Sequence, residues 1–287
     1  MQVKALAGEL PAECQQPLSR FRRQDWVREV TRRGLVARIS GTTIWRWLHE
    51  DAIRPWPHRS WMFPRDPQFQ AKAARVLDLY QGRWQDQALA EDEFVISADE
   101  KTRIQARVRL HPGPAAQPGQ SRRVEFEYAR GGALQYLAGW DVRRAKLFGC
   151  CEPTTGIEPF GRLVHQIMSQ EPYRRAQRVF GIVDNGSAHR GQVAADRLRQ
   201  RYPNLVLVHW PGHASWLNQV EICFSIVQRK VLTPNDFPSL AAVAQRRLEF
   251  GAYYEQIAHP FEWKFTREDL NRLLAKVQPA PALALAA

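Results

Sequence analysis

Residues 210–232 read WPGHASWLNQVEICFSIVQRKVL, and this stretch holds the pattern on which the fold prediction rests. After the loop at its start, apolar residues recur at roughly helical spacing, at Val220, Cys223, Phe224, Val227 and Val231. Glu221 lies beside this apolar stripe, whereas a solvated helix glutamate usually lies opposite it. A carboxylate at the border of a buried helix face indicates a site if other carboxylates converge on it.

Two apolar runs upstream each lead to an aspartate. Phe94-Val95-Ile96 precedes Asp99, and the run 179–183 precedes Asp184, so both read as buried strands that end at their aspartate. Two alternating runs flank Gly131-Gly132 and predict antiparallel strands with a turn at these glycines. The remaining segments predict helices over 158–170 and 192–202, a strand within NLVLVHWP, and the helix that carries Glu221.

The resulting order is strand, strand, strand, helix, strand, helix, strand, helix, which predicts an α/β fold with a mixed sheet. In such sheets, chemistry gathers at strand ends and helix termini. Three carboxylates that converge there repel one another unless a cation lies between them, and oxygen ligands favour Mg²⁺ or Mn²⁺. The four cysteines and the histidines show no zinc-ligand spacing, and the cysteines read as buried thiols in a reducing cytosol.

The charge of the chain favours a polyanionic partner. The formal net charge is +12, and residues 18–75 hold 13 Lys or Arg against five Asp or Glu, a net charge of +8. Within this region, a helix capped by Ser19 and running to about Arg33, followed by a helix from about Thr42 to Glu50, predicts an all-α helix-turn-helix module. An ordinary helical hairpin is the alternative. The residues that would face double-stranded DNA are Thr42, Thr43, Trp45, Arg46, His49 and, in the basic extension, Arg54.

We expect four segments along the 287 residues. The helix-turn-helix module occupies 1–63, a helical linker 64–90, the catalytic domain 91–275 and a frayed tail 276–287. No run of 18 apolar residues is present, and nothing resembles a secretion signal. The sequence therefore predicts a cytoplasmic, nucleoid-associated protein that does not enter a membrane.

Three short motifs carry a resemblance to a known family. The texts SADEKT, VDNGSAHRG and PGHASWLNQVE resemble the acidic motifs of the insertion-sequence 630 transposases, within the Tc1/mariner superfamily, and the resemblance spans about Pro17 to Leu274. It implies an RNase H-like DDE catalytic core that cuts and rejoins DNA with two metal ions, and a homodimer on terminal repeats and target DNA. Carried over by position, Asp99, Asp184 and Glu221 become the catalytic and metal-binding residues. Family members carry a further helix-turn-helix module, which we expect this chain to lack.

Residues next to these acids are further candidates. Asn185 and Asn218 are candidate hydrogen-bond partners of the acids, although Asn185 is equally a turn residue before Gly186. The candidates for contact with substrate phosphate are His189, His213, Lys101 and Arg103; each of the histidines reads equally well as a surface residue. Asp141 reads as a strand-end or turn residue rather than a metal ligand.

Two other functions compete with an active transposase. A catalytically silent relic would bind element ends without cutting them, and an RNase H-type nuclease would act on RNA–DNA hybrids. The three acids argue against the relic, and the basic helical module argues against the nuclease.

Overall fold

The computed structural model describes residues 2–6, 9, 11–51, 64–184 and 192–276. The chain divides into two compact units, Met1–Phe63 and Pro64–Ala287, and each is described by itself. No helix in the described ranges is long and apolar enough to cross a membrane.

The first unit is helical. Its elements are α1 (Gln2–Ala5), α2 (Arg23–Arg32) and α3 (Gly41–Glu50). Trp26 and Val30 of α2 pack with Ile44 and Leu48 of α3 in one apolar core, to which residues near the N-terminus also contribute. The helical periodicity of the sequence therefore translates into a shared buried face, as predicted.

The start of α2 differs from the prediction. Ser19 is not its cap; the helix begins four residues later, where the Asp25 carboxylate accepts the backbone N–H of Arg22 at 2.9 Å. An acceptor at the third helical position satisfies an N–H that the helix itself leaves unpaired. By contrast, α3 has the expected kind of cap, because the Ser40 hydroxyl accepts the backbone N–H of Thr43 at 3.0 Å.

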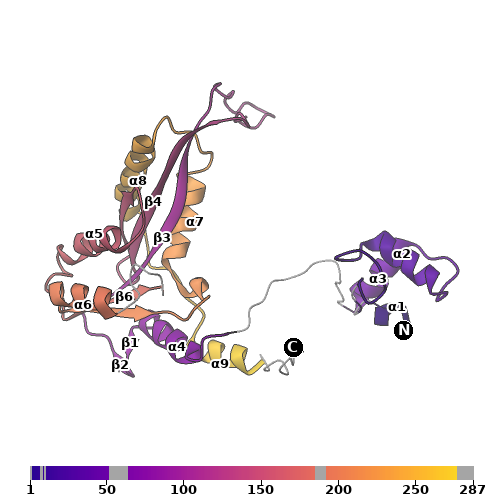
Figure 1. Ribbon diagram of the computed structural model, residues 1–287, viewed down its shortest axis with the longest axis horizontal. Helices are drawn as coiled ribbons and strands as arrows, with labels where there is room; N and C mark the ends of the chain where they lie inside the picture. Colours follow the sequence, from indigo (N-terminus) through magenta and orange to yellow (C-terminus); the bar gives the residue numbers. More distant parts are fainter. Residues whose placement is uncertain (1, 7–8, 10, 52–63, 185–191, 277–287) are drawn as a thin grey trace. The chain divides into compact units, whose positions relative to one another are not determined.

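The second unit is built on a five-stranded mixed sheet, and its long central strands are prominent in Figure 1. The strands are β3 (Glu93–Val108), β4 (Ala129–Asp141), β5 (Lys146–Glu152), β6 (Arg178–Val183) and β7 (Leu205–His209). They lie in the order β5-β4-β3-β6-β7; β3 pairs antiparallel with β4 and parallel with β6. From β3 to the helix that carries Glu221, strands and helices follow one another in the predicted order, although the bounds of the second and third strands differ from the prediction.

Two predicted strand ends are wrong. Asp99 lies inside β3, because pairing with β4 continues past two register shifts as far as Val108. Gly131 and Gly132 lie inside β4 rather than in a turn, and the turn to β5 falls at residues 142–145. Gly132 adopts a φ of +90° beside the Leu240 side chain, which a strand can accommodate at an irregular position when the residue is glycine. The glycine pair thus marks an irregularity within a strand.

Helices cover both faces of the sheet. On one face, α4 (Phe69–Tyr80), α7 (Val220–Lys230) and α8 (Leu240–Glu255) bury the side of β3 that includes Val95, and α9 (Arg267–Lys276) packs on α4. On the other, α5 (Ile157–Met168) and residues of and next to α6 (Gln192–Arg201) bury the side that includes Phe94 and Ile96. Because the side chains of β3 alternate between two cores, the run Phe94-Val95-Ile96 near its start is apolar without a break.

The segment expected as a linker differs from that expectation. Ala73, Val76, Leu77 and Leu79 of α4 are buried in the same core as β3 and α7. The small hairpin of β1 (Arg83–Trp84) and β2 (Gln87–Ala88) follows, and Trp84 packs against Phe180 of β6. Residues 64–90 therefore belong structurally to the second unit.

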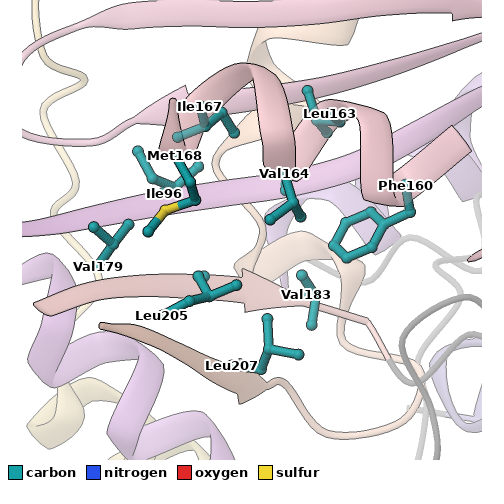
Figure 2. A pocket seen from close by; sticks show the side chains of 12 residues that line it. Ile96, Phe160, Leu163, Val164, Ile167, Met168, Val179, Val183, Leu205 and Leu207 are labelled. Carbon is teal, nitrogen blue, oxygen red and sulfur yellow. The ribbon is translucent and has the colours of Figure 1, made fainter. Parts of the chain in front are cut away.

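A small cavity lies between α5 and the sheet (Figure 2). It has a volume of about 20 Å³ and is lined by apolar residues, among them Phe160 and Ile167 of α5, Gly181 of β6 and Leu207 of β7. A cavity of this size without polar groups stays empty rather than holding an ordered water. It is a packing defect on the face opposite α7.

Candidate active site

The register of two parallel strands brings the first two acids together. The pairing of β3 with β6 runs from Glu93 opposite Arg178 to Ser97 opposite Ile182. Two residues further along this register, Asp99 falls opposite Asp184, which directly follows β6. Only the antiparallel partner β4 accompanies β3 beyond this point. The carboxylates therefore meet where the parallel half of the sheet ends.

A buried asparagine ties the loop before α7 to the first acid. Asn218 is 1% exposed, and its Nδ2 donates to Oδ2 of Asp99 at 2.9 Å. Its Oδ1 accepts the hydroxyl of Ser97, and the Ser97 oxygen in turn accepts the backbone N–H of Val220 at 3.1 Å. This chain of hydrogen bonds fixes both the Asp99 carboxylate and the first residue of α7.

The same loop is held from its other side by α4. The Tyr80 hydroxyl donates to the backbone oxygen of Leu217 at 2.7 Å and accepts the backbone N–H of Gln219 at 3.3 Å. Asn218 was among the expected candidates, whereas Ser97 and Tyr80 were not. Ser97 had a signal in the sequence, since it is a polar residue within an apolar strand and two positions from Asp99, on the same face.

Glu221 is the second residue of α7, and its side chain is exposed while Val220, Cys223 and Phe224 are buried. The buried residues pack α7 against β3 and β4, and Glu221 lies in the first turn of the helix, three residues after Asn218. Its carboxylate is near enough to raise the pKa of Asp99.

The electrostatics of Asp99 reflect this convergence. Burial raises the pKa of the Asp99 carboxyl to about 7; the charges of Asp184 and Glu221 act in the same direction, against hydrogen bonds from the Glu100 N–H and Asn218. A positive charge at this position would relieve both desolvation and repulsion. The donor set consists of carboxylate oxygens, which suits a hard divalent cation.

The other predicted candidates are placed as follows. Lys101 is half-buried and Arg103 is exposed, at a bulge of β3 where Arg103 has a φ of 56°. His213 is exposed in the loop before α7, with a φ of 61°. Asn185, His189 and Arg54 lie outside the described residues.

One histidine near the site has no counterpart in the sequence predictions. His209 ends β7 opposite Val183, and its Nδ1 lies 2.8 Å from the backbone oxygen of Asp184. An N–H donated at that nitrogen would hold the backbone of the second acid. A histidine at a strand end gave the only signal, and it was too weak to select this residue.

Asp141 has a structural role, as the sequence indicated. It is fully buried at the end of β4 and accepts hydrogen bonds from the backbone N–H groups of Arg143 and Arg144 and from the Tyr173 hydroxyl, at 3.0, 2.9 and 2.8 Å. Burial raises its pKa, and these donors oppose the shift. Two donors from the turn after β4 and the Tyr173 hydroxyl use its acceptor positions, which suits a strand-end residue.

The metal-binding arrangement is open in the described residues. Among them, no three His, Cys, Asp or Glu side chains are grouped closely enough to hold a metal ion together. Asp99, Asp184 and Glu221 interact electrostatically without forming such a closed group.

On α3, the expected DNA-facing residues fall into two groups. Thr42, Arg46 and His49 are exposed. Thr43 and Trp45 are half-buried: the Thr43 hydroxyl lies 2.9 Å from that of Ser40, and the Trp45 ring stacks on His49 with centroids 4.8 Å apart. The guanidinium carbon of Arg23 lies 5.7 Å from the centre of the Trp45 ring.

Solved structures confirm the fold class. The chain resembles a Mos1 transposase paired-end complex with left transposon end at 14% identity and a TM-score of 0.58, covering 96% of this chain and 77% of that chain. It also resembles a Mos1 mariner paired end complex with Mn at 15% identity and a TM-score of 0.56, covering 89% and 73%. The mixed sheet with its flanking helices is thus an RNase H-like fold of the transposase kind.

The family follows from the sequence itself. The family described as DDE superfamily endonuclease matches residues 95–243, just over half of the chain. The chain belongs to the DDE endonuclease superfamily, and the match includes Asp99, Asp184 and Glu221. None of the curated protein sequences matches the chain significantly.

Proposed function

We propose that the chain is a DNA transposase of a bacterial insertion sequence, of the 630 type, that cuts element ends and joins them to target DNA. The observation that carries the proposal is the half-buried Asp99 carboxyl with its raised pKa, which lies in register with Asp184 and interacts electrostatically with Glu221. The match to the DDE endonucleases and the likeness of the fold to Mos1 transposase support it.

Asp99, Asp184 and Glu221 would hold two Mg²⁺ or Mn²⁺ ions. Such ions, when bound, activate an attacking hydroxyl and stabilise the departing oxygen of a phosphodiester. One structure of the Mos1 protein is described with Mn and another with Mg, which supports divalent ions here as well.

The protein groups around the acids would position the substrate and the ligands. Asn218 holds Oδ2 of Asp99 and the backbone N–H of Glu100 holds Oδ1 at 2.8 Å, so the protein orients both oxygens of this carboxylate. Lys101 and Arg103 follow Asp99 on the same strand and would contact phosphates of the cleaved strand. No covalent bond between protein and DNA is required, because water and then the freed 3′-hydroxyl would be the nucleophiles.

The first unit would bind double-stranded DNA as a helix-turn-helix module. Arg46, His49 and Thr42 are exposed on α3, and the region 18–75 carries a net charge of +8. Terminal repeats and target DNA would be the partners, a homodimer would assemble on them, and the protein would act in the cytoplasm at the nucleoid. Mos1 has been solved as a paired-end complex with a transposon end, which supports this assembly.

The experiment is a cleavage assay on a supercoiled plasmid that carries the DNA flanking the gene. We expect nicks or breaks at the element ends with Mg²⁺ or Mn²⁺ and none with Ca²⁺. Binding to these ends without cleavage under any ion would identify the silent relic. Cleavage of an RNA–DNA hybrid in preference to the plasmid would identify an RNase H-type nuclease.

A further inference from the structure

A second cavity, which has a polar lining, lies away from the three acids, at the free edge of β5. It has a volume of about 290 Å³ and is bordered by β5, by the C-terminal end of α5 and by α8. Its polar lining includes Lys146, Gln166, Gln170, Arg247 and Glu255. β5 is an edge strand of the sheet, and Tyr136 of β4 also lines the cavity, whereas Asp99 lies on the next strand, β3.

Arg247 is the unusual residue of this cavity. The side chain comes from α8 and is only 3% exposed, yet its Nε and Nη1 have no hydrogen-bond partner among the described residues. Its guanidinium carbon lies 3.2 Å from the centre of the Tyr136 ring, so the ring covers one face of the cation. The unpaired donors lie in the guanidinium plane, which the ring does not occupy. A buried charge with free donors is costly unless an anion pairs with it.

Protein groups near Arg247 do not neutralise it. Burial raises the pKa of Tyr136 to about 12 and also raises that of Cys151, so the phenol and this thiol are uncharged at neutral pH. No carboxylate in the described part of the chain forms an ion pair with Arg247. The guanidinium is therefore held in place by packing, without a counter-ion from the protein.

Lys146 adds a second cation to the cavity. Its Nζ donates to Oε1 of Gln170 at 3.1 Å and lies 3.8 Å from a Glu255 oxygen, with the Glu255 side chain 45% exposed. Two cations against one solvated carboxylate leave a net charge of +1. The Oε1 atom of Gln166 is also buried without a partner, and a half-turn of this amide would present its N–H₂ group instead.

We propose that this cavity binds a phosphoryl group, with Arg247 and Lys146 as its ligands. The cavity has room for a phosphate group and part of the molecule that carries it, and arginine and lysine are both common ligands for phosphate. The phosphate can belong to a small phosphorylated molecule or to a nucleic-acid backbone that passes the β5 edge.

The test uses inorganic phosphate and the full-length protein. Phosphate is titrated at constant ionic strength with chloride as the reference anion, and heat of binding and Tm are recorded. We expect a saturable rise in Tm beyond that seen with chloride. Arg247→Met, which keeps the buried stem, should abolish the response, and Lys146→Gln should weaken phosphate binding about tenfold. Arg246→Gln removes the same charge from an exposed neighbour on α8 and should leave phosphate binding unchanged.

The results that support the proposal differ from those that overturn it. A Tm response no larger than that of chloride, or an equal response in Lys146→Gln and the parent, would overturn the proposal. If Arg247→Met fails to fold, the comparison of phosphate binding by Lys146→Gln with phosphate binding by Arg246→Gln tests the proposal. A duplex oligonucleotide then identifies the source: displacement of bound phosphate assigns the site to a nucleic-acid backbone, and simultaneous binding of both assigns it to a small phosphorylated molecule.

Discussion

Glu221 is exposed on a helix whose neighbouring residues are buried, so its replacement separates function from stability. Glu221→Gln keeps the shape of the side chain and removes one charge from the proposed metal site. We expect Mg²⁺-dependent cleavage to fall by at least about 100-fold, since even residues that support metal ligands are often worth 10–100-fold. The free energy of unfolding should change by no more than about 0.5 kcal/mol, as for other exposed positions. Plasmid cleavage and urea denaturation measure the two effects, and cleavage at the rate of the parent would return Glu221 to the status of a solvated glutamate.

The raised pKa of Asp99 predicts how the stability of the protein depends on pH. Its folded pKa of about 7 lies above the value of an unfolded aspartate, so the folded state binds the extra proton between these values. The metal-free protein should therefore lose stability as pH rises from about 4 to about 7. Asp99→Asn should remove this loss and raise the free energy of unfolding at pH 8 by roughly 2 kcal/mol.

The effect of Mg²⁺ on Tm tests whether Asp99 is a metal ligand. Mg²⁺ should raise the Tm of the parent and have little effect on Asp99→Asn. Asp141→Asn is the matched variant. The Asp141 carboxylate is buried and accepts hydrogen bonds from the turn after β4, so this variant should keep the Mg²⁺ response. A parent protein whose Tm is insensitive to Mg²⁺ at pH 8 would contradict the assignment of Asp99 as a ligand.

At the scale of elements, two glycines of the sheet should respond in opposite directions to alanine. A Cβ on Gly181 of β6 would lie 3.3 Å from Cδ2 of Leu207, a flexible end beside the cavity of Figure 2. Gly181→Ala should stabilise the protein by about 0.5–1 kcal/mol through the lower entropy of the unfolded chain. A Cβ on Gly149 of β5 would lie 2.3 Å from the Tyr136 hydroxyl oxygen, and Tyr136 is held under Arg247. Gly149→Ala should destabilise by about 1–3 kcal/mol or more. Chemical denaturation measures both, and the same sign for the two variants would refute this account of the packing.

For the whole molecule, the basic charge predicts how DNA binding depends on salt. The affinity of the full-length protein for duplex DNA should fall linearly on a log–log plot against salt concentration, because each phosphate contact releases counter-ions. Arg46→Gln on α3 should reduce the steepness of this slope by about 1. Arg174→Gln, an exposed arginine of the second unit, is the matched control and should leave the slope unchanged. Fluorescence anisotropy measures it; equal slopes for the parent and Arg46→Gln would exclude α3 from the DNA interface.

The sequence alone determined the order of strands and helices from Phe94 to the helix that carries Glu221, and it determined the family. Apolar spacing is local information, and it placed the helix after Trp210 and the strands before Asp99 and Asp184 because each pattern lies within a few residues. The motifs around the three acids were enough to identify a DDE endonuclease, which the family match confirms. The role of each acid as a metal ligand stays a prediction.

Only the tertiary structure decided where β3 ends and what surrounds Asp99. A strand continues as long as a partner pairs with it, and the partner of β3 beyond Asp99 is a segment about 30 residues away. The bonds from Asn218 to Asp99 and from Tyr80 to the loop before α7 join residues 119 and 137 positions apart. The same holds for Arg247, whose burial against Tyr136 depends on how α8 packs on the sheet. Contacts between such distant segments produce no periodic pattern in the sequence. The polar or aromatic character of one residue does not show which distant residue it contacts.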